Sequence, residues 1–253
     1  MEFSHVLSCA LDIGEHMLVS GAEVYRVEDC IRRICFAYGA SDVDVFTITS
    51  SIVVTVEPPG AQRLTQTRRI ARYATNLDRV HRLNQLSREM CRDRISYQEF
   101  RTRFQSIMDC KPYSVRKEFL AYALIASSFT VFFGGSWRDA LISAIIGLVL
   151  KATVMLIGAV NFNHVLSNLI ASFVMSTLAY LSVRFGLADT VDMIVIGNIM
   201  LVIPGVALTN SLRDMVSGDT MAGILRFIEA CILALAIAGG YFLASLLVGG
   251  VAV

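Results

Sequence analysis

Apolar and polar positions follow two different patterns along the chain. Up to about residue 117, apolar residues recur at helix or strand spacing among charged ones, whereas beyond it they form long, almost uncharged runs. Residues 3–18 and a stretch from Val24 to near Gly39 each predict a helix with one apolar face. Residues 43–57 are rich in β-branched side chains and predict strands, and Pro58 to Gly60 turns the chain into a third strand at about 61–67.

Two further amphipathic helices complete this first region. Apolar positions from Leu77 to Met90 line one of them, and apolar positions from Phe100 to Ile107 line the other. Capping-box motifs, Ser20 to Glu23 and Ser96 to Glu99, mark predicted helix starts. The first region therefore reads as a small α/β domain with one modest core.

Five apolar runs in the second region are long enough to cross a bilayer, which takes roughly 20 residues. The predicted spans are about 118–135, 139–160, 164–183, 190–212 and 221–250. The expected fold is an α-helical membrane protein with about five transmembrane helices, preceded by a small α/β cytoplasmic domain. Its boundaries are predicted at 1–116 for the cytoplasmic domain and 117–253 for the transmembrane domain.

Composition and charge agree with this division. The chain is 55% hydrophobic, above the usual content of a soluble domain, and its mean hydropathy is +0.61. Residues 1–117 hold 17 of the 22 Lys and Arg residues. Lys111, Arg116 and Lys117 directly precede the first span, so the positive-inside rule predicts a cytoplasmic N-terminal domain. An odd number of spans then predicts a C-terminus outside the cell, and the first residues lack the features of a secretory signal.

No catalytic or metal-binding motif is present. The sequence contains no GxSxG, HExxH, P-loop or GxGxxG pattern, and its six cysteines form no CxxC or Cys/His cluster. A solvated helix face explains the basic stretch from Arg68 to Arg82 more simply than binding of nucleic acid or lipid head groups does. We therefore expect no enzyme activity, no metal, no cofactor and no nucleic-acid partner.

Charged residues inside predicted spans are costly and often functional. Lys151 lies near the middle of the second predicted span, far from either end. It could contact an anionic substrate, pair with an acid, or extend its stem to the membrane interface. Arg226 and Glu229 lie three positions apart in the last span, where an intrahelical ion pair is the simplest interpretation.

The stretch VIPGVALTNSLRDMVSGD, residues 202–219, combines a helix break with polar groups. Pro204 and Gly205 interrupt the apolar run and predict a hinge. Asn210 and Asp214 would share one helical face, and Arg213 would point elsewhere. Asp219 or Thr220 could cap the last helix. Two interpretations stay open: a discontinuous helix that binds a substrate, or a kinked span followed by a cytoplasmic loop.

Two stretches resemble one known family. SGAEVYRVEDCIRRICFAYG, residues 20–39, and MLVIPGVALTNSLRDMVSGDTMAGILRF, residues 200–227, resemble the threonine/serine exporter (ThrE-like) family. The chain looks most like the larger subunit of its split two-component form (the YjjP type). The resemblance implies a bacterial inner-membrane exporter whose second helical bundle comes from a small partner membrane subunit.

The function expected from this resemblance is secondary export of small carboxylates. Fused members are associated with threonine and serine, and the split form with C4-dicarboxylates such as succinate, with the proton gradient as the driving force. We expect Lys151, Asn210, Arg213, Asp214 and Asp219 to bind substrate or couple transport. A membrane-anchored sensor or assembly scaffold acting through its soluble domain is the alternative, and the sequence leaves the oligomeric state open.

Overall fold

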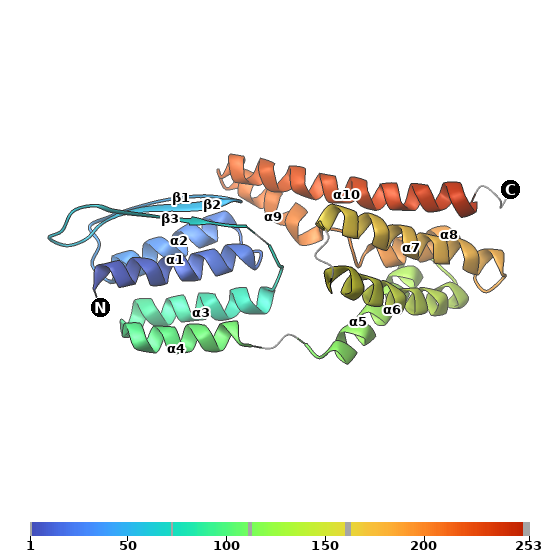
Figure 1. Ribbon diagram of the computed structural model, residues 1–253, viewed down its shortest axis with the longest axis horizontal. Helices are drawn as coiled ribbons and strands as arrows, with labels where there is room; N and C mark the ends of the chain where they lie inside the picture. Colours follow the sequence, from blue (N-terminus) through green and yellow to red (C-terminus); the bar gives the residue numbers. More distant parts are fainter. Residues whose placement is uncertain (1, 72, 111–112, 160–162, 250–253) are drawn as a thin grey trace. The chain divides into compact units, whose positions relative to one another are not determined.

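The computed structural model describes residues 2–71, 73–110, 113–159 and 163–249 (Figure 1). The chain divides into two compact units. Unit 1 contains Met1–Lys111 together with Gly205–Ile228, and unit 2 contains Pro112–Pro204 together with Glu229–Val253. The first segment of unit 1 ends near the predicted domain boundary. Unit 1 also includes the stretch after the Pro-Gly break, which the sequence assigned to the second domain.

Unit 1 combines a three-stranded antiparallel sheet with helices. The sheet has the order β1 (Asp42–Ile48), β2 (Ser51–Glu57) and β3 (Leu64–Arg69), and Val45 faces Val54 in its register. Inward side chains of β1 and β2 join the buried core with α1 (Phe3–Val19), α2 (Val24–Ala37), α3 (Leu77–Asp93) and α4 (Tyr97–Met108). On the opposite face of the sheet, Phe46 is exposed. The strands and helices expected in this region are therefore present.

The predicted capping box at Ser20 is wrong. Gly21 has a φ of +95°, and its N–H donates to the Leu18 carbonyl while the Ala22 N–H donates to the Met17 carbonyl. This pair of bonds is the Schellman motif, which ends a helix. Ser20 and Gly21 therefore close α1, and Glu23 at the N-cap of α2 makes no side-chain cap bond. The other predicted box is present in part, because the Ser96 hydroxyl accepts from the Glu99 N–H at 3.3 Å.

Unit 2 is a bundle of mostly apolar helices. It contains α5 (Val115–Phe132), α6 (Trp137–Ala159), α7 (His164–Arg184), α8 (Val191–Ile199) and the part of α10 (Thr220–Val248) that follows Ile228. Small residues let its helices approach closely, since a Cβ on Gly147 would lie 2.9 Å from the Tyr122 carbonyl oxygen. A buried polar chain links three helices: the Thr130 hydroxyl donates to Ser143 Oγ, and Asn198 Nδ2 donates to the same oxygen.

Three of the described helices are long and apolar enough to cross a membrane: α6, α7 and α10. α5 has 18 residues, and its first turns carry Arg116, Lys117 and Glu118. The predicted fourth span is divided into α8 and α9 (Gly205–Val216), which have 9 and 12 residues. The fold is thus that of a helical membrane protein with a small sheet, and the number of five spans stays a prediction.

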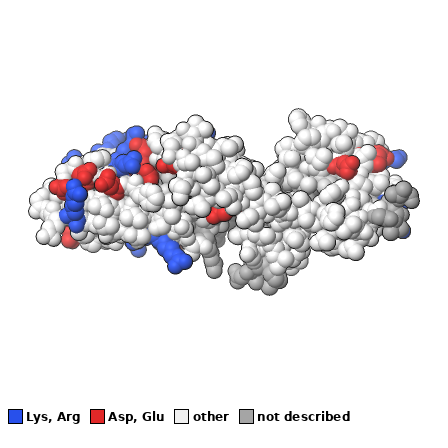
Figure 2. All heavy atoms as spheres, turned by 90° about the horizontal axis from the view of Figure 1, so that it is seen from above, with Lys and Arg blue, Asp and Glu red and all other residues white. Residues whose placement is uncertain are grey.

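Charged side chains are distributed unevenly over the surface. On the face in Figure 2, Lys, Arg, Asp and Glu side chains gather over unit 1, whereas the visible surface of unit 2 is almost uncharged. Exposed large apolar residues are frequent on the helices of unit 2, including Leu141, Leu156 and Leu235. Such a surface is suited to lipid contact.

Candidate functional site

The helix break predicted at Pro204 is present. α8 ends at Ile199, and α9 begins at Gly205. Between them the chain makes tight turns, in which the Leu201 N–H donates to the Asn198 carbonyl and the Val202 N–H to the Ile199 carbonyl. Pro204 has no N–H to donate and directly precedes the first residue of α9.

Polar side chains of α9 hold the loop that joins α1 to α2. Asn210 Nδ2 donates to the Gly21 carbonyl at 2.8 Å, and Arg213 pairs with the Glu23 carboxylate. Asp214 Oδ1 accepts from the Val24 N–H at 3.2 Å. These contacts all lie within unit 1. We call the loop residues 21–24, together with Asn210, Arg213, Asp214 and Arg226, the clamp.

Arg226, from the first part of α10, completes the clamp. Its Nη1 lies 3.0 Å from Asp214 Oδ2, and its Nη2 donates to the Ala22 carbonyl at 3.4 Å. The Asp214 side chain is fully buried, and the Arg226 side chain is 8% exposed. The Arg226 guanidinium thus pairs with Asp214, and the intrahelical pair expected between Arg226 and Glu229 stays a prediction. Removing a partner from such a buried pair would leave an uncompensated charge.

The environment of Asp214 shifts the pKa of its carboxyl group. Burial raises the pKa of the Asp214 carboxyl, and the nearby carboxylates of Asp219 and Glu23 raise it further. The Arg226 guanidinium and the Val24 N–H act in the opposite direction and lower this pKa. Burial also raises the pKa of Glu28, one helical turn beyond Val24 on α2. Glu28 Oε1 accepts from the Thr47 N–H at 2.8 Å. Burial therefore disfavours the charged form of two carboxyls, Asp214 in the clamp and Glu28 on α2.

The Gly218-Asp219 pair has a structural role at the end of α9. Gly218 has a φ of +100°, and its N–H donates to the Met215 carbonyl while the Asp219 N–H donates to the Asp214 carbonyl. This is a second Schellman motif. The Asp219 carbonyl then accepts from the Gly223 N–H in the first turn of α10. Asp219 therefore joins the two helices through its backbone, and its carboxylate acts on Asp214 and Glu28 by charge.

Lys151 lies in unit 2, so the five predicted site residues belong to two different units. Its Nζ is 2.6 Å from Glu118 Oε2, and it also lies 5.3 Å from the centre of the Tyr122 ring. Lys151 thus pairs with an acid, and its contact with an anionic substrate or with the membrane interface stays a prediction. Substrate binding and coupling by these five residues stay predictions.

Sequence reasoning missed several partners in these contacts. The sequence pattern places Glu23 in a capping box and gives Glu118 no role. One signal was available for the first, since GAE lies in the stretch that carries the family resemblance. The contact between Val24 and Asp214 joins residues 190 positions apart, and no periodic pattern in the sequence indicates such a contact.

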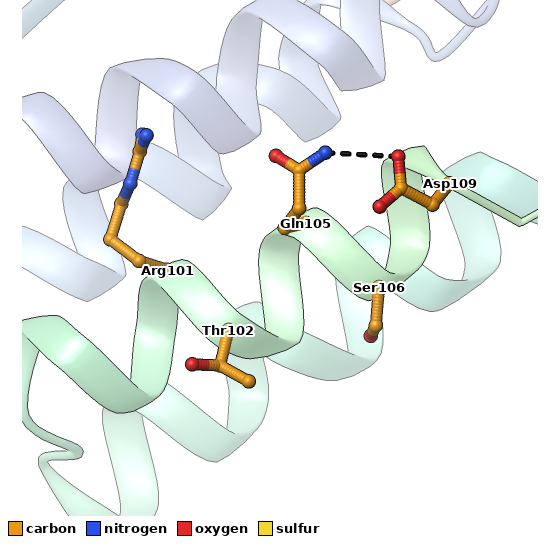
Figure 3. A pocket seen from close by; sticks show the side chains of 5 residues that line it. All are labelled: Arg101, Thr102, Gln105, Ser106 and Asp109. Carbon is orange, nitrogen blue, oxygen red and sulfur yellow. Dashed lines mark hydrogen bonds between the residues drawn. The ribbon is translucent and has the colours of Figure 1, made fainter.

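A surface hollow of about 520 Å³ lies on α4, and none of the predicted site residues lines it. Figure 3 shows its lining side chains, Arg101, Thr102, Gln105, Ser106 and Asp109, along one helix. Gln105 Nε2 donates to Asp109 Oδ1 at 2.9 Å. Within the described part of the chain, no group of three or more His, Cys, Asp or Glu residues could hold a metal ion. The hollow has the character of an ordinary polar helix face.

Comparison with known proteins matches almost the whole chain to one family. Residues 8–248 match the ThrE family, described as "Putative threonine/serine exporter". A threonine/serine exporter of Corynebacterium glutamicum is 23% identical over 232 residues, covering 88% of this chain and 47% of that protein. An uncharacterized protein of Schizosaccharomyces pombe is 27% identical over 185 residues, covering 69% of this chain and 22% of that protein.

The matched region includes both the clamp and the apolar helices. The chain spans about half the length of the bacterial relative and about a fifth of the yeast one. No solved structure matches it. Because the family match extends from α1 to the end of α10, this chain belongs to the ThrE family of threonine/serine exporters.

Proposed function

We propose that this chain is a subunit of a secondary exporter in the bacterial inner membrane. It would move small carboxylates out of the cell, threonine and serine or a C4-dicarboxylate such as succinate, driven by the proton gradient. The family match over residues 8–248 carries this proposal, because it includes three helices able to cross a membrane. We place the N-terminal domain in the cytoplasm and the C-terminus outside, with five spans.

A second helical bundle would complete the transporter. The chain aligns with 47% of the Corynebacterium glutamicum exporter, so more than half of that relative lies outside the match. We propose that a small partner membrane subunit supplies this bundle. An inverted five-span unit would fit the repeat architecture of many secondary transporters.

The clamp would couple the cytoplasmic region to the membrane helices. α10 begins in unit 1 and continues in unit 2, so a change in the clamp has a continuous helix along which to act. Protonation of Asp214 would weaken its pair with Arg226 and its cap on α2, which makes it the proposed proton-coupling group. Pro204 and Gly205 would form the hinge between α8 and α9.

Reconstitution tests the proposal. The chain is incorporated into proteoliposomes with and without its partner subunit, and efflux of threonine and of succinate is measured under an imposed proton gradient. Gradient-dependent efflux of either compound only with both subunits is the expected result. Absence of transport of both, together with ligand or protein binding by the soluble domain, would instead favour the sensor or scaffold.

A further inference from the structure

The pair of Glu118 and Lys151 is an unusual feature within unit 2. Lys151 is the one charged residue of α6 beyond Asp139, and it lies eight residues before the end of that helix at Ala159. It is the fifteenth of the 23 residues of α6, and its partner Glu118 lies in the first turn of α5, beside Lys117. Charged side chains within membrane helices are costly and often functional. Helix packing does not require an ammonium group at this position, so we expect the pair to have a function.

Close packing of α5 against α6 brings the charges together. Gly147 lies one helical turn before Lys151, and its missing side chain lets the Tyr122 backbone approach. Glu118 and Tyr122 are also one turn apart on α5, so both side chains reach the same part of α6. The Lys151 ammonium then lies between the Glu118 carboxylate, at 2.6 Å, and the Tyr122 ring, at 5.3 Å.

This pair is accessible, in contrast to the buried pair of the clamp. The side chains of Lys151 and Glu118 are 13% and 30% exposed, against 8% and 0% for Arg226 and Asp214. Asp214 also accepts a backbone hydrogen bond, whereas Glu118 has no further side-chain partner among the described residues. An ammonium has three N–H donors, so Lys151 can bind an additional anionic ligand.

The two opposite charges select a chemical class of ligand. A zwitterion can give its carboxylate to Lys151 and its ammonium to Glu118, and the net charge of the site then stays unchanged. The Tyr122 ring can contact either ammonium through its face. A dicarboxylate would bring two negative charges to one ammonium and leave Glu118 uncompensated, which is costly at low dielectric.

We propose that Lys151, Glu118 and Tyr122 form a binding site for the head group of a zwitterionic α-amino acid. Lys151 binds the carboxylate, Glu118 binds the ammonium, and Tyr122 provides an aromatic wall. This inference rests on the proposed export function and makes an amino acid, rather than a C4-dicarboxylate, the substrate.

Transport kinetics of the reconstituted exporter with its partner subunit test the site. Three probes are used: L-threonine, 2,3-dihydroxybutanoate, which replaces the ammonium by a hydroxyl, and succinate. Glu118→Gln should raise KM for threonine roughly tenfold to hundredfold and leave KM for 2,3-dihydroxybutanoate unchanged, because a charged hydrogen bond is lost only with the amino acid. Lys151→Gln should raise KM for both.

Two controls separate binding from structure. Arg138→Gln removes an exposed ion pair with Asp189 in the same unit, 3.8 Å long, and should leave every KM unchanged. The charge-swapped variant Glu118→Lys with Lys151→Glu should keep the melting temperature in detergent without restoring threonine transport. Full restoration of transport by the swap would identify a structural pair and overturn the proposal.

Binding measured without transport distinguishes the two proposals. Titration calorimetry of L-threonine with the full chain and partner in detergent should give a Kd that Glu118→Gln weakens. Binding of this kind without any efflux would refute the export function and support the site. Wild-type efflux with unchanged KM in Glu118→Gln and Lys151→Gln would support export and overturn the site.

Discussion

Asp214 on α9 caps helix α2, which begins 190 residues earlier in the chain: its Oδ1 accepts from the Val24 N–H at 3.2 Å. A carboxylate is favourable there because the first N–H groups of a helix lack partners and carry partial positive charge. α2 has no side-chain cap of its own. The start of α2 therefore depends on a residue from another part of the sequence.

Asp214→Ala should destabilise the protein strongly. The change removes the cap and leaves the buried Arg226 guanidinium unpaired, a loss of about 3–5 kcal/mol in the free energy of unfolding. Denaturant unfolding of the full chain in detergent, followed by circular dichroism, measures it. Asp44→Ala, at an exposed position on β1, should change stability by less than about 0.5 kcal/mol. Equal stability of the two variants would contradict the role of the clamp.

Arg213 and Arg226 should respond very differently to truncation. The Arg213 side chain is 57% exposed beside Glu23, so Arg213→Ala should cost at most about 1 kcal/mol. Arg226→Ala leaves Asp214 buried without its partner and should cost about 3–5 kcal/mol. The same unfolding experiment compares them. Loss of export in a stable Arg213→Ala protein would assign Arg213 a role in transport, and similar destabilisation by both changes would contradict this account.

Local patterns made much of unit 1 predictable. Alternating β-branched residues indicated β1 and β2, and apolar spacing indicated the helices, because both patterns arise from one buried face. The capping box failed because Ser20 is followed by Gly21. A glycine at this position ends the preceding helix more readily than serine starts the next one.

The candidate site was predictable only in part. Pro204 indicated the break between α8 and α9, since proline disrupts helices through local geometry. The partners of Asp214 and Lys151 were not indicated, because tertiary pairing leaves no periodic signal in a single sequence. Hydropathy also could not show that residues 205–228 pack with the N-terminal residues, since packing depends on the three-dimensional arrangement.

The raised pKa values of Asp214 and Glu28 predict a specific pH dependence. For a carboxyl whose pKa is raised by folding, the protonated form is favoured in the fold. The associated stability is present below the unfolded pKa, 3.8 for Asp214 and 4.5 for Glu28, and is lost as pH rises through the folded pKa. Asp214→Asn and Glu28→Gln should therefore each flatten the decline in unfolding free energy above pH 4. Unfolding curves between pH 4 and 7 measure this, and slopes identical to wild type would contradict it.

Gly197→Ala should disrupt the packing of α8 on α5. An added Cβ would contact the Thr130 hydroxyl and lie 2.8 Å from the Ala126 carbonyl oxygen, so the helices must separate. Overpacking of this kind costs about 1–3 kcal/mol. Gly158→Ala in α6 is the control, because nothing lies within 4 Å of its added Cβ. Melting temperatures in detergent should fall for the first variant alone.

Alanine substitutions at two glycines near the ends of α9 distinguish the effect of backbone strain from the effect of hinge motion. Gly218 has a φ of +100°, so Gly218→Ala should lower stability by about 1 kcal/mol. Gly205 has no atom within 4 Å of an added Cβ, and Gly205→Ala should keep or raise stability by up to about 1 kcal/mol, because alanine restricts the unfolded chain. If Gly205 acts as the proposed hinge, the stable Gly205→Ala exporter should nevertheless transport more slowly, since the restricted backbone opposes bending between α8 and α9. Export at the wild-type rate by a fully folded Gly205→Ala protein would show that the break at Pro204 is a static feature of the fold.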